Sequence, residues 1–225
     1  MRFQNAAKDA RAIVYAGIQA DPLVERVARL LADAGYPERL LARAVMNGET
    51  LDADAWRTMF PTLFGPDAED ATLARAEAVL AVSLDVAGRG EQVRSQFRGA
   101  IVEALTERLL GRRVPPAAIH RERRILFDGV ATEIHPYDVT VETPGASEAY
   151  DCKWGARGIG ADVLNQLDDA RRHAADEGER LTAVLVIFDA SRTCQIRLAR
   201  QTAPRKDLRM VTLESLDRMA GAGKR

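Results

Sequence analysis

The sequence is poor in cysteine and has no long apolar run. Its 225 residues include only Cys152 and Cys194 as cysteines, which are too few for a disulfide framework and form no CxxC zinc pattern. No apolar segment approaches the roughly 20 residues needed to cross a bilayer. The first residues lead into a mixed charged segment that does not resemble a signal peptide. We therefore expect a cytoplasmic protein without a membrane partner.

Net positive charge and lysine are also scarce. The formal net charge is −1, so the overall charge of the protein does not favour binding of a polyanion. Local basic clusters can still occur on a protein whose net charge is near zero. Only four of the 32 basic residues are lysines, and three of them lie near an end or in a polar stretch. Lys153 alone lies in a strand-like segment, where a compact ammonium can hold a water or a phosphate oxygen as a point charge.

Residues 1 to about 90 have a pattern that predicts helices throughout. Helix stops occur at Asp21-Pro22, Gly35, Gly48 and Gly88, and a loop is expected at 60–66 because of its proline and glycine content. The expected helices cover 5–19, 23–35, 37–48, 52–59 and 71–86. We expect an all-α N-terminal domain, 1–90, that serves partner contact, dimerisation or target recognition.

The second half changes to a mixed pattern. A helix is expected over 92–110, because Val93, Phe97, Ile101, Leu105 and Leu109 form an apolar stripe at helical spacing. Strands are expected at 123–127, 138–142, 149–154 and 181–188, with weaker candidates at 195–198 and 208–213. A helix at 161–175 and a short one at the end complete the pattern. The order predicts an α/β domain, 91–225, with a central mixed sheet flanked by helices.

Two of these strands carry residues suited to phosphodiester chemistry. Asp151 and Lys153 are two positions apart on one strand and therefore share a face. A hairpin across 143–148 would bring Asp138 to a similar depth, and the backbone carbonyl of Cys152 lies between Asp151 and Lys153. Carboxylate and carbonyl oxygens suit Mg²⁺ or Mn²⁺, while the ammonium can position a water or steady a phosphoryl oxygen.

These residues resemble a known nuclease signature. His135-Pro136-Tyr137-Asp138, twelve residues and then Asp151-Cys152-Lys153 are similar to the motif of the PD-(D/E)XK nucleases, which have the restriction-endonuclease-like fold. Gly99 and Glu103 resemble the Gly-x-x-x-Glu of the family's first core helix. Gln166 resembles the glutamine of a later helix. The resemblance covers roughly residues 95 to 213.

The resemblance implies a Mg²⁺-dependent nuclease with DNA as the favoured substrate. Asp138, Asp151, Glu103 and the Cys152 carbonyl would hold the metal, and Lys153 would serve the attacking water. Gln166, Arg157 and Arg171 are candidate substrate contacts. Glu107, one turn beyond Glu103, is the alternative acid on that helix.

Plainer interpretations stay open for each residue. Asp138 and Asp151 could be edge-strand charges in water, with Asp151 and Lys153 as a same-face ion pair of little energetic value. Glu103 could be a solvated helix residue, and Gln166 a surface residue. The alternative function is a nuclease-like domain that binds nucleic acid or a partner protein without cutting, and a mostly helical adaptor is a third possibility. DNA versus RNA, endonuclease versus exonuclease, sequence specificity, oligomeric state and pathway (restriction, repair or defence) all stay open.

Overall fold

The computed structural model describes residues 1–7, 10–131, 135–201 and 208–221. The chain divides into two compact units, which we call the helical unit (10–108) and the α/β unit (1–9 and 109–225). The sequence analysis placed the boundary near residue 90. The structural division assigns residues 91–108 to the helical unit and the first nine residues to the α/β unit. None of the helices in the described ranges combines the length and apolar character needed to span a bilayer.

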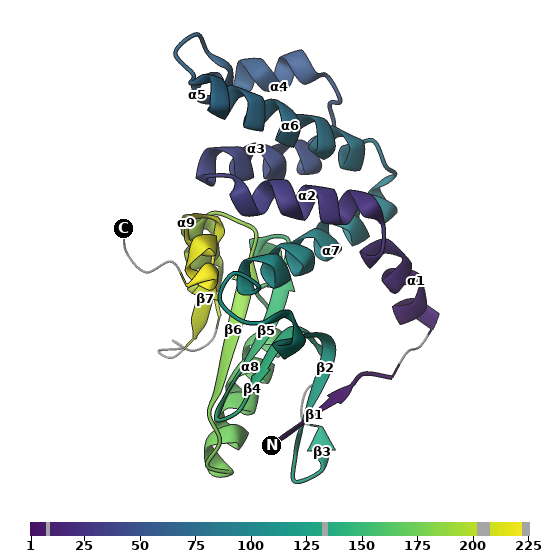
Figure 1. Ribbon diagram of the computed structural model, residues 1–225, viewed down its shortest axis with the longest axis vertical. Coiled ribbons are helices and arrows are strands. Elements are labelled where there is room, and N and C mark those ends of the chain that lie inside the picture. Colours follow the sequence, from purple (N-terminus) through teal and green to yellow (C-terminus); the bar gives the residue numbers. More distant parts are fainter. Residues whose placement is uncertain (8–9, 132–134, 202–207, 222–225) are drawn as a thin grey trace. The chain divides into compact units, whose positions relative to one another are not determined.

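The helical unit is built from helices whose ends follow the expected stop signals. They are α1 Ala10–Gln19, α2 Pro22–Asp33, α3 Tyr36–Asn47, α4 Ala53–Met59, α5 Pro61–Phe64, α6 Asp70–Ala87 and α7 Glu91–Leu110 (Figure 1). The Asp21 side chain caps α2 by accepting a hydrogen bond from the Leu23 amide at 2.8 Å. The short helix α5 lies where the sequence predicted a loop.

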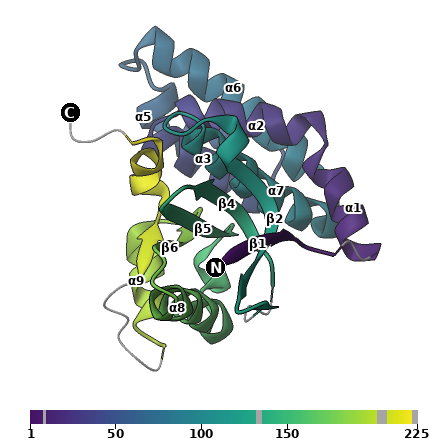
Figure 2. The ribbon, with the colours of Figure 1, turned by 60° about the horizontal axis from the view of Figure 1, so that its bottom comes forward.

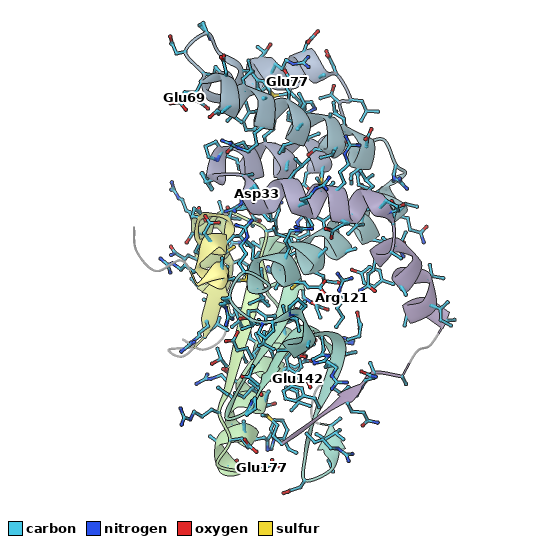
Figure 3. The ribbon with its side chains drawn as sticks, in the orientation of Figure 1. Asp33, Glu69, Glu77, Arg121, Glu142 and Glu177 are labelled. Carbon is cyan, nitrogen blue, oxygen red and sulfur yellow. The ribbon has the colours of Figure 1, made fainter. Side chains whose placement is uncertain are left out.

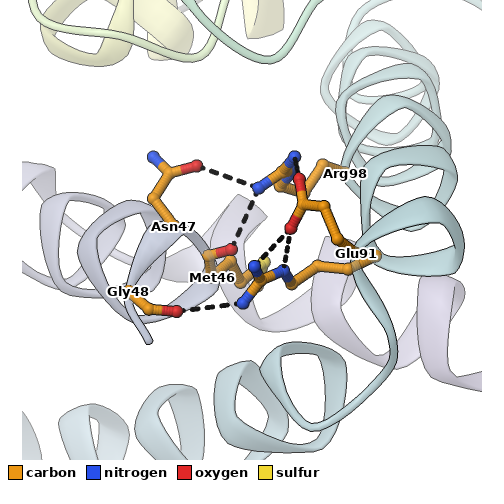
Figure 4. A network of polar contacts seen from close by, with 6 residues as sticks. Met46, Asn47, Gly48, Glu91 and Arg98 are labelled. Carbon is orange, nitrogen blue, oxygen red and sulfur yellow. Dashed lines mark hydrogen bonds and ion pairs between the residues drawn. The ribbon is translucent and has the colours of Figure 1, made fainter. Parts of the chain in front are cut away.

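A polar network secures the C-terminal end of α3 (Figure 4). The last carbonyls of a helix have no partners within it. Here the Arg94 guanidinium donates to the Gly48 carbonyl at 2.9 Å, and Arg98 donates to the Met46 carbonyl at 3.3 Å. Glu91 pairs with both arginines. The first turns of α7 thus satisfy the end of α3.

The described residues of the α/β unit form a seven-stranded mixed sheet, which confirms the expected α/β class with a central mixed sheet. Its strands are β1 Arg2–Asn5, β2 Ile119–Phe127, β3 Val130–Ala131, β4 Tyr137–Thr143, β5 Ala146–Lys153, β6 Leu181–Ile187 and β7 Arg209–Val211. The order is β1-β2-β4-β5-β6-β7, with β3 paired to β2. β5, β6 and β7 run parallel and the other pairs antiparallel. The other elements are α8 Ala161–Asp176, α9 Ser191–Leu198 and 3₁₀ segments η1 Pro116–Ala118, η2 Ala156–Gly158 and η3 Leu213–Ala220.

Two sequence-based assignments in this unit were wrong. Residues 2–5 form a strand instead of a helix, because they pair with 123–126 of β2, a distant partner that local sequence does not reveal. Residues 195–198 belong to helix α9 instead of a strand. The Glu214 carboxylate accepts from the Ser191 amide at 2.9 Å and so satisfies a donor at the start of α9.

Polar contacts of Glu142 and Glu177, both labelled in Figure 3, join neighbouring parts of this unit. Arg123 of β2 donates to the Glu142 carboxylate of β4 at 2.7 Å. Glu177, which follows α8, accepts from the backbone amide of Asp128 at 2.8 Å. These contacts tie β2 to the strand beside it and to the end of α8.

The two faces of the sheet have different coverage. Asp151 pairs with Leu185, and Lys153 with Ile187. Leu185 and Ile187 belong to the core formed with Leu164 and other residues of α8, which lies along the sheet (Figure 2). Partners in a parallel register point to the same face. The candidate acid and lysine therefore lie on the face that α8 covers, at the C-terminal end of β5.

Candidate active site

Asp151 and Lys153 form an ion pair at the end of β5. The Lys153 ammonium contacts Asp151 Oδ1, and the side chains are 31% and 7% exposed. Besides this contact, the buried Oδ1 has no hydrogen-bond partner among the described residues. A buried carboxylate needs such compensation. The interpretation of Asp151 as an edge-strand charge in water is therefore wrong, whereas the same-face ion pair with Lys153 that the plainer interpretation offered is present.

Asp138 lies directly beside this pair. The β4–β5 hairpin forms as expected, with Thr143 opposite Ala146 and Val139 opposite Tyr150. One residue before Val139, Asp138 Oδ2 accepts from the backbone amide of Cys152 at 2.6 Å. The structure thus brings together the three charged groups that the sequence singled out.

The charge of Lys153 is determined by these carboxylates. Burial lowers the pKa of Lys153, but the negative charges of Asp138 and Asp151 raise it by more, so the pKa lies above its ordinary value. Lys153 is therefore an ammonium at neutral pH, a donor without a lone pair.

Gly158 approaches the Lys153 side chain in a way that leaves no room for another residue. A Cβ built on Gly158 would lie 2.8 Å from Lys153 Cβ, 2.8 Å from Cγ and 2.9 Å from Cδ. The contact involves the root of the lysine side chain, which cannot swing away as a flexible end would. The sequence analysis missed this residue, although three glycines within 155–160 directly follow the lysine and were an available signal.

A buried carboxylate, Asp189, anchors the segment that carries Gly158. Asp189 is 5% exposed. Its Oδ2 accepts from the Ala156 amide at 2.9 Å and its Oδ1 from the Ala190 amide at 2.8 Å. The preceding residue, Phe188, donates its amide to the Lys153 carbonyl at 2.9 Å. Asp189 was also missed; an acid that directly follows the most apolar strand was the available signal.

Gln166 is buried and engaged by the backbone that leads into β4. It is 6% exposed. Its Nε2 donates to the His135 carbonyl at 3.0 Å, and its Oε1 accepts from the His135 amide at 3.2 Å. The Tyr137 hydroxyl donates to the Gln166 carbonyl at 3.2 Å. The surface interpretation of Gln166 is wrong, and the residue holds the chain just ahead of Asp138.

Glu103 lies in the helical unit and is 4% exposed, so its interpretation as a solvated residue is wrong. Its carboxylate accepts from the Tyr15 hydroxyl at 2.5 Å and from Gln19 Nε2 at 2.7 Å. A Cβ on Gly99 would lie 2.9 Å from that hydroxyl. The Gly-x-x-x-Glu spacing thus has a structural role, because Gly99 makes room for the tyrosine that binds Glu103. Glu107 is half-buried.

The remaining candidates lie near the lysine or on α8. Arg157 is exposed on η2, one position before Gly158. Arg171 is half-buried and pairs with Asp168 at 3.5 Å. The Trp154 ring stacks on Phe188 with centroids 4.8 Å apart.

The oxygen donors of this cluster fit a hard divalent cation. Asp138 and Asp151 supply adjacent carboxylates, and the buried Asp151 Oδ1 has the Lys153 ammonium as its polar contact among the described residues. Mg²⁺ is commonly held by one or two protein carboxylates, with water and substrate phosphate as its other ligands. Within the described ranges, no group of three or more His, Cys, Asp and Glu residues has an arrangement that could hold a metal.

Comparison of the chain with protein-family models and with curated proteins finds no match. The function is therefore inferred from the chemistry of the site. It comprises two neighbouring carboxylates, a lysine held in its charged form and a rigid glycine-containing segment that fixes the lysine.

Proposed function

We propose that this chain is a Mg²⁺- or Mn²⁺-dependent phosphodiester hydrolase, a nuclease with DNA as the favoured substrate and a restriction-endonuclease-like α/β unit. The single observation that carries the proposal is the cluster of Asp138, Asp151 and Lys153 at adjoining strand ends. It is supported by the raised pKa of Lys153 and by the burial of the Asp151 carboxylate, whose Oδ1 contacts the Lys153 ammonium.

Each residue has a defined part in this proposal. Asp138, Asp151 and the Cys152 carbonyl would hold the cation. Glu103, the further ligand that the sequence suggested, accepts hydrogen bonds from Tyr15 and Gln19 within the helical unit and is not part of this proposal. When bound, the cation would acidify a water and neutralise charge on the phosphate. Because Lys153 is an ammonium, it donates hydrogen bonds to the attacking water or to a phosphoryl oxygen and does not take the water's proton.

Hydrolysis breaks one P–O ester bond as the water oxygen bonds to phosphorus. The water's proton passes to solvent, and the leaving oxygen gains one. Arg157, exposed beside the lysine-bearing end of β5, suits a flanking phosphate, since arginine recognises phosphate through paired donors. Arg171 is a second candidate contact. The helical unit would serve target recognition, partner contact or homodimer formation.

The test is cleavage of single- and double-stranded DNA and RNA with Mg²⁺ or Mn²⁺. Asp138→Asn and Lys153→Ala are each expected to lower cleavage by at least about a hundredfold. Asp162→Asn, which removes an exposed carboxylate from the first turn of α8, is the matched control and should cut normally. Folded Asp138→Asn and Lys153→Ala proteins that both retain full activity would refute the proposal.

A second candidate is binding of nucleic acid or a partner protein without cleavage. The ion pair between Lys153 and Asp151 favours it, because the two groups can compensate each other without a cation. This function predicts affinity that chelation of divalent ions does not change, together with intact substrate under every metal tried. Chelator-sensitive cutting would exclude it.

A further inference from the structure

A pocket lies at the β7 side of the sheet, and Tyr150, Val184 and Arg209 line it from the face opposite Asp151 and Lys153. Tyr150 of β5 pairs with Val184 of β6, and Val184 with Arg209 of β7, so these side chains form a row across three strands. The cavity has a volume of about 460 Å³, within the usual range for small-molecule sites. Its lining includes Arg113, Glu148, Tyr150, Arg209, Arg218 and Met219.

One arginine of this pocket is fixed in place. Arg113 Nε donates to the Met219 carbonyl at 2.8 Å, and Nη2 donates to the Tyr150 hydroxyl at 2.9 Å. Arg113 also pairs with Glu148, and Tyr150 donates to the same carboxylate. These contacts neutralise the charge of Glu148, which is the only acid among the described residues of the pocket lining. Glu148 would therefore repel an incoming anion only weakly.

The other two arginines are differently placed. Arg209 and Arg218 are exposed, and their guanidinium groups have no ion pair with an acid in the described ranges. Guanidinium groups bind carboxylate and phosphate through paired donors. Val184, Val211 and Met219 provide an apolar wall beside them.

We propose that this pocket binds an organic anion with an apolar body. A carboxylate or phosphate head would lie between Arg209 and Arg218, and the body would cover Val184, Val211 and Met219. This site is independent of the phosphodiester chemistry, because Asp151 and Lys153 face the other side of the sheet.

The test follows methionine methyl signals by NMR, with protein labelled at methionine methyl carbons. Met210 and Met219 line the pocket, while Met46 is buried in the helical unit and serves as an internal reference. The probes are decanoate and decyl phosphate, compared with acetate, inorganic phosphate and decanol. Saturable shifts of Met210 and Met219, but not Met46, are expected with decanoate, decyl phosphate or both, and the tighter probe identifies the head group.

Single-residue variants distinguish binding at a specific site from general electrostatic attraction of the anion to the protein. Arg209→Gln and Arg218→Gln are each expected to weaken binding of the tighter probe about tenfold, in line with the loss of one charged hydrogen-bond pair. Arg192→Gln removes an exposed arginine on α9, outside the lining, and should bind normally. The proposal is overturned if no amphiphilic anion shifts the two methionines, if decanol or inorganic phosphate binds as tightly, or if Arg192→Gln weakens binding equally.

Discussion

A Cβ placed on Gly158 would lie 2.8 Å from the Cβ of Lys153. Real side chains do not approach so closely, so only glycine allows this segment to lie against the lysine. The segment is held in turn by Asp189 through the Ala156 amide. The position of the Lys153 ammonium beside Asp151 therefore depends on residues that do not themselves face the carboxylates.

Replacing Gly158 by alanine tests this dependence. Gly158→Ala is expected to displace Lys153 or η2, to cost about 1–3 kcal/mol of stability through overpacking, and to lower cleavage about a hundredfold, as displacements near 1 Å do. Gly160→Ala is the matched control, because a Cβ there meets nothing within 4 Å. Comparable cleavage rates for the two variants would contradict the positioning role.

Both carboxylate oxygens of Asp189 are expected to be needed, because each accepts a hydrogen bond from a backbone amide. In Asp189→Asn one of the two backbone amides, of Ala156 or Ala190, faces an NH₂ group instead of an acceptor. An unsatisfied buried donor costs about 1–3 kcal/mol. Urea unfolding should show this loss. Cleavage measured well below the melting temperature should also fall, because η2 loses an anchor. A fully active variant would separate Asp189 from the site.

Gln166 is expected to hold the backbone of His135 in place and not to contact the substrate. Gln166→Ala removes the partner of the His135 amide and carbonyl. Because His135 is exposed and water can replace the lost partner, each hydrogen bond is expected to cost about 0.5–1.5 kcal/mol. The melting temperature should fall, with KM for nucleic acid unchanged at low temperature. Gln195→Ala, at an exposed glutamine of α9, provides the comparison. A raised KM without a loss of stability would restore Gln166 as a substrate contact.

The helical unit offers a separate test at Glu103. Tyr15→Phe removes the 2.5 Å hydrogen bond to the buried carboxylate and is expected to destabilise the protein by about 1–3 kcal/mol. Gly99→Ala should do the same by displacing the Tyr15 hydroxyl. Urea denaturation of both variants, beside Gly90→Ala, where a Cβ meets nothing within 4 Å, checks this. Unchanged stability in Tyr15→Phe would argue that the contact is dispensable.

Much of the secondary structure of the α/β unit could be predicted from the local sequence pattern. The apolar run at 181–188 and the alternation at 138–142 predicted β6 and β4, and the turn at 144–145 predicted the hairpin that joins β4 to β5. These signals are local, because strand periodicity and turn residues act within a few positions. The spacing of Asp151 and Lys153 then indicated their shared face.

What the sequence did not predict depends on distant partners. Residues 2–5 became a strand only by pairing with β2. The roles of Gly158 and Asp189 depend on how closely η2 approaches Lys153, a distance that no spacing encodes. The Gly99–Glu103 pattern was noticed, but its contact with Tyr15 joins residues 88 positions apart.

The raised pKa of Lys153 leads to a prediction about pH. The carboxylates of Asp138 and Asp151 stabilise the ammonium in the folded state. This contribution to stability is fully present below the unfolded pKa of about 10.4 and is lost only as pH rises through the higher folded value. Lysine titration should therefore affect neither stability nor cleavage between about pH 6 and pH 9.

The profile of kcat/KM across that range, measured for the wild type and for Lys153→Arg, checks this prediction. Arginine keeps the positive charge, but its planar group differs in shape from an ammonium beside Gly158, so a uniform loss of activity is expected with an unchanged profile. A wild-type rise with pH that disappears in Lys153→Arg would instead identify a neutral lysine acting as a base. That outcome would contradict the ammonium role, because a lysine that is paired with Asp151 and lies near the charge of Asp138 gives up its proton only at higher pH.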